Sequence, residues 1–168
     1  MTGSAAGVER VRSLSEEART ALGAIASVVS TLSPEGQVGV LVWAPKPGSR
    51  YDRALAAVRR VAADFDPMRV RFDANVNPFV GNVHLAGLTT FGGFEDAARY
   101  TVGEFAIAIA TSALGLRWTL SIPLRGAAGV VGSFTLHFTD VPDEARRAAA
   151  ESYARRVESE LASGPTAA

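Results

Sequence analysis

The sequence predicts an α+β fold, a central and mostly antiparallel β-sheet with a long helix near each end of the chain. Three observations lead to this class. Residues 116–138 alternate apolar and polar side chains in two runs joined by a glycine-rich segment, which is typical of a β-hairpin. Residues 8–32 and 142–162 repeat apolar residues every three or four positions, the spacing of amphipathic helices. Strands and helices that do not alternate regularly indicate a layered α+β domain.

The chain has the length of one domain. With 168 residues, of which 48% are hydrophobic, it can bury a core without disulfides or structural metals. Residues 1–7 are small and polar and are expected to be disordered, as is the tail at 163–168. Residues 8–162 are therefore predicted to form a single domain.

The predicted hairpin has one apolar face. Its strands are 116–124 and 130–138, and residues 125–129 form the turn. Because successive side chains of a strand point to opposite sides, the large apolar residues of both strands share one face. They are Leu116, Trp118, Leu120, Ile122, Leu124, Val130, Phe134, Leu136 and Phe138. Helices must cover this face, since burying each large side chain contributes roughly 1.5–3 kcal/mol.

The opposite face of the hairpin is polar. A hairpin symmetric about Ala127 pairs Arg117 with His137, Thr119 with Thr135, and Ser121 with Ser133. Two interpretations of this row are open. It forms the wall of a ligand pocket, in which Arg117 and His137 bind an anionic group and the hydroxyls form hydrogen bonds. Alternatively it is a solvated face, as antiparallel sheets often have. His137 is also considered as a general base or metal ligand, although no carboxylate or second histidine is near it in the sequence.

The two long helices are expected to cover the apolar face. The stripe in 8–32 is an a/d heptad pattern that leaves Leu22 and Val29 free for a second contact. The helix at 142–162 is capped by Asp140 and is rich in alanine, so it cannot cover the sheet alone. We therefore predict that the first helix shares this role and that the chain forms a homodimer through its terminal helices.

Shorter elements are predicted between the first helix and the middle of the chain. Residues 38–43 are apolar on both faces and indicate a strand covered on both sides. Residues 52–65 have helical spacing with Asp52 as the cap, and 68–72 alternate as a short strand.

A long loop and a middle helix precede the hairpin. Residues 73–94 are rich in Asn, Gly and Pro, and a loop of this length is functional or contains a short element. His84 in this loop is either exposed or a haem ligand, because one neutral imidazole suffices for haem. Residues 95–113 predict a helix with Phe105 and Ile109 on one stripe.

Composition excludes several kinds of site. The chain has no cysteine, which rules out disulfides, thiol catalysis, thiolate metal sites and covalent attachment of a bilin. Lys+Arg and Asp+Glu both total 17, so net charge gives no indication of nucleic acid or anionic membrane as a partner. No apolar run is long enough to span a membrane, and the N-terminus does not resemble a signal peptide. The expected location is the cytoplasm, and the Ala- and Arg-rich composition is typical of a bacterial protein.

Residues 102–138 resemble the second half of a GAF domain. Val102-Gly103-Glu104-Phe105 opens a helix that leads through Leu114-Gly115-Leu116-Arg117 into a strand ending at Pro123-Leu124. A glycine-containing turn, a strand over 129–138 and a closing helix follow in the same order. The pattern consists of hydrophobic spacing and small residues, and it extends to Leu161. Before Val102 the resemblance is weak, because a helix at 52–65 intervenes where the family has consecutive strands.

The resemblance implies a small-molecule pocket. The terminal helices would cover one face of the sheet, and the shorter middle helix and loops would cover the other, with the pocket between them. Such domains bind cyclic nucleotides, haem, tetrapyrroles or other metabolites, and often dimerise through their terminal helices. The ligand-binding residues would be Arg117, Thr119, Ser121, Ser133, Thr135, His137, His84, Phe105 and Ile109. The ligand itself is not identified, and haem or another non-covalently bound molecule is compatible with the sequence.

The expected function is a non-catalytic sensor or regulatory domain that signals to a partner through its terminal helices. Two alternatives stay open. One is a small enzyme that uses Arg117 and His137 in the same pocket, and the other is an interaction scaffold that binds no ligand.

Overall fold

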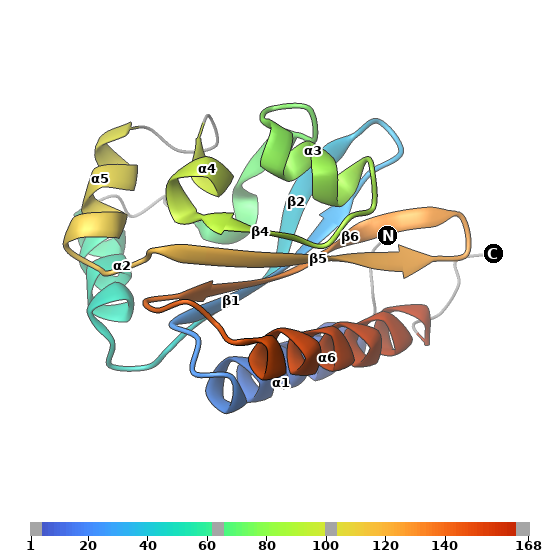
Figure 1. The fold of residues 1–168 in the computed structure, drawn as a ribbon, viewed down its shortest axis with the longest axis horizontal. Coiled ribbons are helices and arrows are strands. Elements are labelled where there is room, and N and C mark those ends of the chain that lie inside the picture. Colours follow the sequence, from blue (N-terminus) through green and yellow to red (C-terminus); the bar gives the residue numbers. More distant parts are fainter. Residues whose placement is uncertain (1–4, 62–65, 100–103, 164–168) are drawn as a thin grey trace.

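A six-stranded antiparallel sheet forms the centre of the molecule (Figure 1). The computed structural model describes residues 5–61, 66–99 and 104–163. The strands are β1 (Ala26–Leu32), β2 (Gln37–Pro45), β3 (Arg71–Asp73), β4 (Thr90–Gly93), β5 (Trp118–Gly126) and β6 (Gly129–Phe138). Their order in space is β3-β2-β1-β6-β5-β4, so strands from opposite ends of the chain meet at the centre. The predicted α+β class is confirmed.

Helices α1 (Ala5–Ala21) and α6 (Glu144–Ala162) cover one face of the sheet and lie side by side (Figure 1). They run in opposite directions, because Arg10 Nε lies 2.6 Å from Glu160 Oε2 and Arg156 Nη1 lies 3.0 Å from Glu17 Oε1. The largest side chains of the core between these helices and the sheet are Val11, Val29, Val42, Leu120, Leu124, Phe134, Leu136, Phe138 and Val157. The first helix therefore shares the cover of the hairpin's apolar face, as predicted.

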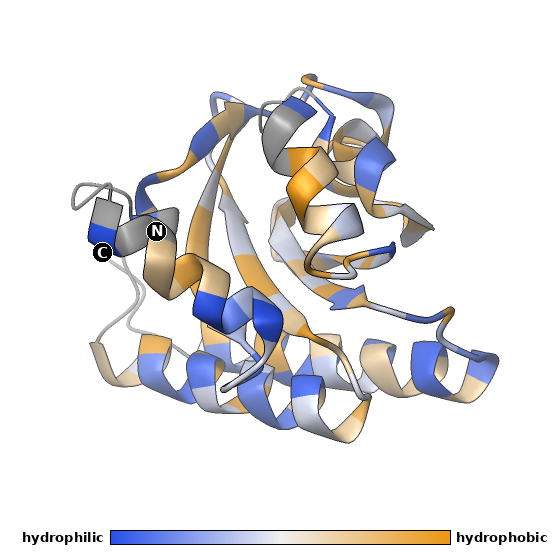
Figure 2. Cartoon of the chain, turned by 90° about the vertical axis from the view of Figure 1, so that its left-hand side faces the viewer, coloured by the Kyte–Doolittle hydropathy of each residue, from blue (hydrophilic) through white to orange (hydrophobic). Residues whose placement is uncertain are grey.

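Short elements cover the opposite face. They are α2 (Arg50–Val61), the 3₁₀ helix η1 (Pro67–Arg69), α3 (Pro78–His84), α4 (Phe94–Ala98) and α5 (Glu104–Ser112). Figure 2 shows the layers from the side, with α1 and α6 below the sheet and the short helices α3, α4 and α5 above it. Two small apolar clusters lie in this upper layer. One contains Ala26, Tyr51, Ala110 and Leu116, and the other contains Val38, Ala74 and Val80.

The predicted helix over 8–32 is wrong beyond residue 21. Helix α1 ends at Ala21, Gly23 takes a left-handed φ of +67°, and residues 26–32 form the central strand β1. The heptad spacing continued by coincidence into a β-branched segment, and pairing with β2 on one side and β6 on the other makes that segment a strand. Leu22 and Val29, assigned to a dimer contact, are buried in the main core instead.

The start of α1 and the caps of two other helices also differ from expectation. Helix α1 begins at Ala5, so residues 5–7 are helical rather than disordered. Helix α2 begins at Arg50 because Ser49 Oγ accepts from the backbone N–H of Asp52, and Asp52 is therefore not the cap. The predicted end of this helix, 62–65, lies outside the described residues. Helix α6 is capped by Asp143, which accepts from the backbone N–H of Arg146, and not by Asp140.

The long loop over 73–94 contains two elements. Helix α3 starts at Pro78, where Asn77 Oδ1 accepts from the backbone N–H of Val80. Strand β4 follows at Thr90–Gly93 and pairs with β5. The strand predicted over 68–72 is displaced, because residues 67–69 form η1 and β3 begins at Arg71.

The predicted helix over 95–113 is divided in two. Helix α4 ends at Ala98, since Arg99 has the extended backbone angle ψ 128° that no helix accommodates. Helix α5 begins at Glu104. The stretch between them, 100–103, lies outside the described residues.

Candidate functional site

The polar face of the hairpin lies on the side of the sheet away from α1 and α6. Strands β5 and β6 pair Thr119 with His137 and Ser121 with Thr135, whereas Ser133 lies opposite Pro123. The predicted pairs were therefore wrong by two residues. The turn is shorter than assumed, with Gly126 opposite Gly129, and the register shifts by one after Leu124. Because the displacement is an even number of residues, the side chains before the register shift stay on their predicted faces. Beyond the shift, Val131 and not the predicted Val130 packs against the main core.

Arg117 does not belong to the polar row. It precedes the first residue of β5 and its side chain is exposed, while its backbone N–H donates to the carbonyl of Phe138. The predicted contact between Arg117 and His137 is therefore wrong. The row of side chains that remains carries no guanidinium for an anionic ligand.

Strand β1 supplies part of the site that the sequence did not predict. Ser30 is opposite Ser133, and Val28 is opposite Thr135 on one side and Trp43 of β2 on the other. One continuous row therefore crosses four strands, made of Trp43, Val28, Thr135 and Ser121. The site was incomplete in the sequence because residues 26–32 were assigned to a helix.

A chain of hydrogen bonds ties α3 to the sheet. His84 Nδ1 lies 3.1 Å from the carbonyl oxygen of Val80, and His84 Nε2 lies 3.0 Å from Ser30 Oγ. Ser30 Oγ is 2.8 Å from Ser133 Oγ, which is 3.3 Å from Thr135 Oγ1. Thr135 Oγ1 lies 2.5 Å from Ser121 Oγ. Ser30, Ser133, Ser121 and His84 are all buried, so this network lies between α3 and the sheet.

The two histidines are both held neutral. Burial lowers the pKa of His84 from its usual 6.5, against a smaller opposing effect of its bond to Val80. Burial lowers the pKa of His137 to about 4. The Nδ1 atom of His137 lies 3.0 Å from Thr119 Oγ1, and Phe94 meets the imidazole edge-on at 5.4 Å between ring centroids.

The cover of this face is incomplete at its centre. On the side of α1 and α6, the central residues of β1 and β6 are fully buried, namely Ser27, Val29, Phe134, Leu136 and Phe138. On the opposite side Val28, Thr135 and His137 are partly exposed, although they belong to the two central strands. We call these three residues the floor patch. A central strand with exposed side chains indicates a place where the upper layer leaves room.

Aromatic side chains border the floor patch. Trp43 is directly opposite Val28 and stacks on Tyr51 of α2, with ring centroids 6.2 Å apart and an interplanar angle of 11°. Burial raises the pKa of Tyr51, so its hydroxyl stays protonated. Phe94, at the start of α4, borders the patch at His137. Aromatic walls around a few polar groups are typical of small-molecule sites.

The two site residues predicted on the middle helix are not brought to the floor patch by any described contact. Ile109 lies on α5 and is 38% exposed, whereas Ala110 is buried among the α5 side chains that the structure describes. The side chain of Phe105 lies outside the described part of the chain.

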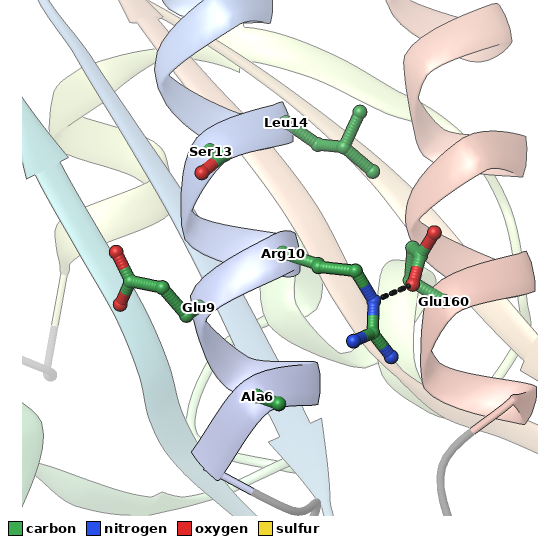
Figure 3. Close-up of a pocket in the computed structure, with 6 residues that line it drawn as sticks. All are labelled: Ala6, Glu9, Arg10, Ser13, Leu14 and Glu160. Carbon is green, nitrogen blue, oxygen red and sulfur yellow. Dashed lines mark hydrogen bonds and ion pairs between the residues drawn. The ribbon is translucent and has the colours of Figure 1, made fainter.

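Two hollows lie on the surface, and the second shares Trp43 with the border of the floor patch. One, of about 520 Å³, is open and lies where the start of α1 meets the end of α6 (Figure 3). Its lining residues are Ala6, Glu9, Arg10, Ser13, Leu14 and Glu160. The other, of about 200 Å³, lies between Arg12, Trp43 and Asp52. Within the described residues, no group of three or more His, Asp or Glu side chains is placed to bind a metal ion.

Solved structures share this architecture. The GAF domain/HD domain protein from Geobacter sulfurreducens has a TM-score of 0.66 at 11% identity, over 92% of this chain and 91% of that one. A red/green cyanobacteriochrome in its red light-absorbing state has a TM-score of 0.64 at 12% identity, over 92% and 93% of the two chains. The chain has the GAF-domain fold. The phycocyanobilin-bound GAF domain from a cyanobacterial phytochrome is also similar, with a TM-score of 0.62 at 12% identity over 93% and 84%.

The likeness to GAF domains is one of fold, because it rests on solved structures at 7–14% identity. No protein-family model matches this sequence, and no curated protein does. The helix at 52–65 that weakened the resemblance is real in its described part, since α2 follows β2 directly. None of the helices that the structure describes is long and apolar enough to cross a membrane.

Proposed function

We propose that this GAF domain is a non-catalytic sensor that binds a small molecule non-covalently above the floor patch. The observation that carries the proposal is the partial exposure of Val28, Thr135 and His137 in the two central strands, at a place bordered by Trp43 and Phe94. Binding a ligand there would bury apolar and aromatic surface that the fold alone leaves in contact with water.

Signalling would pass from this site through the sheet to α1 and α6. The floor patch and the main core share strands β1 and β6, so a shift of either strand reaches the terminal helices. The homodimer predicted from the sequence belongs to this proposal. The outward side of α1 and α6 carries charged side chains, among them Glu9, Arg10, Glu17 and Arg156, so such a dimer would have a polar interface.

The enzyme alternative has less support in the geometry. A general base works best with a pKa near the operating pH, and the pKa of His137 is about 4. Arg117, its proposed partner, is exposed and lies outside the polar row.

The residues present limit how a bilin or a haem could bind. The similar phytochrome domain is described as phycocyanobilin-bound. This chain has no cysteine, so a bilin would have to bind without a thioether bond. A haem bound through His84 would require the imidazole to leave Ser30, because both ring nitrogens already have partners.

Native mass spectrometry of the protein purified from its own cells tests the proposal. We expect a small molecule that is present in the native mass and lost on denaturation. Val28→Trp would fill the space above the floor patch and abolish this added mass. Val141→Trp, at an exposed position before α6, is the matched control and should keep it. Equal occupancy in both variants would place the ligand elsewhere, and no added mass in the wild type would favour the scaffold alternative.

A further inference from the structure

We infer that the site takes an uncharged ligand that donates a hydrogen bond, from an N–H or O–H group, to Thr135. This inference rests on the proposed function, since it describes the chemistry of the same site. It follows from two independent observations, the absence of charge on this part of the sheet and the direction of the hydrogen bonds beneath it.

The part of the sheet that faces the ligand has no charged residue. Around the floor patch, β1, β5 and β6 consist of residues 26–30, 119–123 and 133–137, respectively. None of these segments contains Asp, Glu, Lys or Arg. The titratable side chain in these three segments is His137, which is neutral because burial lowers its pKa to about 4. A charged ligand group would lose its hydration and gain no opposite charge from these strands.

The direction of the hydrogen-bond chain is fixed at its α3 end. The carbonyl of Val80 can only accept, so His84 Nδ1 must donate to it. A neutral imidazole has a single N–H, which leaves His84 Nε2 as an acceptor. Ser30 therefore donates its hydroxyl proton to His84 Nε2.

The donor and acceptor in each following hydrogen bond are then determined in turn. Ser30 Oγ has given its proton to His84, so Ser133 must donate in the bond of 2.8 Å between them. Ser133 Oγ then accepts from Thr135 over 3.3 Å, and Thr135 Oγ1 accepts from Ser121 over 2.5 Å. The backbone N–H of Ser133 also donates to Ser30 Oγ, which fills both lone pairs of that oxygen.

The partly exposed end of the chain can therefore only accept. Thr135 has used its proton on Ser133 and one lone pair on Ser121, and one lone pair is left. A ligand acceptor placed against Thr135 would meet an oxygen without a free proton, whereas a ligand donor would satisfy that lone pair. The uncharged strands and the free lone pair of Thr135 together select an uncharged ligand with a hydrogen-bond donor.

Three dyes with one shared ring system test the inference. N-phenyl-1-naphthylamine is uncharged and has an N–H donor. Its N-methyl derivative is uncharged and lacks the donor, and 1-anilinonaphthalene-8-sulfonate keeps the donor but adds a negative charge. In fluorescence titrations at neutral pH we expect the N-methyl derivative to bind about fivefold more weakly than the parent amine. We expect the sulfonate to bind about tenfold more weakly or worse.

Substitution of Thr135 tests whether its hydroxyl is the group that accepts the ligand's hydrogen bond. In Thr135→Val the parent amine and its N-methyl derivative should bind equally, because the only acceptor that separates them is gone. The ratio of the two dissociation constants within one variant is insensitive to any loss of stability. Thr20→Val, on the exposed side of α1, is the matched control and should keep the wild-type ratio.

The outcomes separate the inference from the proposed function. Equal affinity of the wild type for the amine and its N-methyl derivative overturns the donor requirement. Equal affinity for the amine and the sulfonate overturns the requirement for an uncharged ligand. In both cases binding that is lost in Val28→Trp would leave the proposed function standing. Binding that survives Val28→Trp, or no binding of any dye, would overturn both.

Discussion

At the scale of single residues, the buried serines of this sheet face, Thr135 and His84 form hydrogen bonds with one another. Ser30, Ser121, Ser133 and His84 are buried, and each has a hydrogen-bond partner. A buried hydroxyl without a partner would cost about 1–3 kcal/mol, so the network stabilises the fold as well as shaping the site. Burial, and not these hydrogen bonds, keeps the two histidines neutral.

His137 should make the stability of the domain depend on pH. Its pKa is 6.5 in a free imidazole and about 4 in the fold, so the unfolded chain binds the proton first as pH falls. The contribution of His137 to the unfolding free energy is therefore complete above pH 6.5 and is lost as the pH falls to about 4. We expect a loss of about 3–4 kcal/mol at most, since each pKa unit corresponds to about 1.4 kcal/mol.

Urea unfolding of the wild type and His137→Gln at pH 7 and pH 4.5 measures this effect. The wild type should lose more stability than the variant between the two pH values. Acidic residues and His84 titrate in both proteins, so the difference between them isolates His137. Identical losses in the two proteins would contradict the assigned pKa.

At the scale of elements, α3 is held on the sheet by the bond between His84 and Ser30. Ser30→Ala removes the donor to His84 Nε2 and the acceptor for the backbone N–H of Ser133. We expect a loss of about 1–3 kcal/mol and faster amide exchange in α3, measured by hydrogen–deuterium exchange. Ser13→Ala on the exposed side of α1 is the control. Unchanged exchange in α3 would show that packing of Val80 and Val83 alone holds this helix.

Two glycines provide a matched test of how closely elements approach. A Cβ on Gly132 of β6 would lie 2.0 Å from the carbonyl oxygen of Ser30, which is backbone of the neighbouring strand. A Cβ on Gly81 of α3 would meet its nearest atom, the carbonyl oxygen of Ala74, at 3.6 Å. We expect Gly132→Ala to lower the unfolding free energy by about 3 kcal/mol or to prevent folding. Gly81→Ala should raise it by up to about 1 kcal/mol, because alanine favours a helix.

Thermal and urea unfolding of both glycine variants give the comparison. If Gly132→Ala were as stable as the wild type, β1 and β6 could not be as close as the structure shows. A loss in Gly81→Ala would mean that α3 lies closer to residue 74 than an ordinary contact.

At the scale of the whole molecule, the fold has two unlike layers around one sheet. The main core with α1 and α6 is one continuous cluster of buried side chains, whereas the upper layer consists of short helices over two small clusters. Elements with few buried apolar contacts open more easily, so the side that would bind a ligand is also the side expected to move.

A homodimer through α1 and α6 would have to use a charged surface. Ion pairs such as Arg10 with Glu160 lie along these helices, and their side chains are up to half exposed. We expect such a dimer to weaken as salt rises, since charge interactions are screened within about 3 Å at 1 M salt. Sedimentation velocity at low salt and at about 1 M salt measures it. A dimer that persists unchanged at high salt would indicate an apolar interface elsewhere.

Local features that depend on alternation and spacing could be predicted from the sequence. The two faces of the hairpin, the stripe of α6 around Ala154 and Val157, and the GAF resemblance from Val102 onward needed only neighbouring residues. An even register error could not move a side chain to the other face, so Thr119, Ser121, Ser133, Thr135 and His137 were identified correctly as one polar row.

Features that depend on pairing between distant segments could be read only from the three-dimensional structure. Residues 26–32 have a heptad-like spacing, and only hydrogen bonds to β2 and β6 make them a central strand. Ser30 and Val28 thereby enter the site, and α3 brings His84 to Ser30 from 54 residues away. A local pattern cannot encode such contacts, because their free energy comes from packing partners that the pattern does not contain.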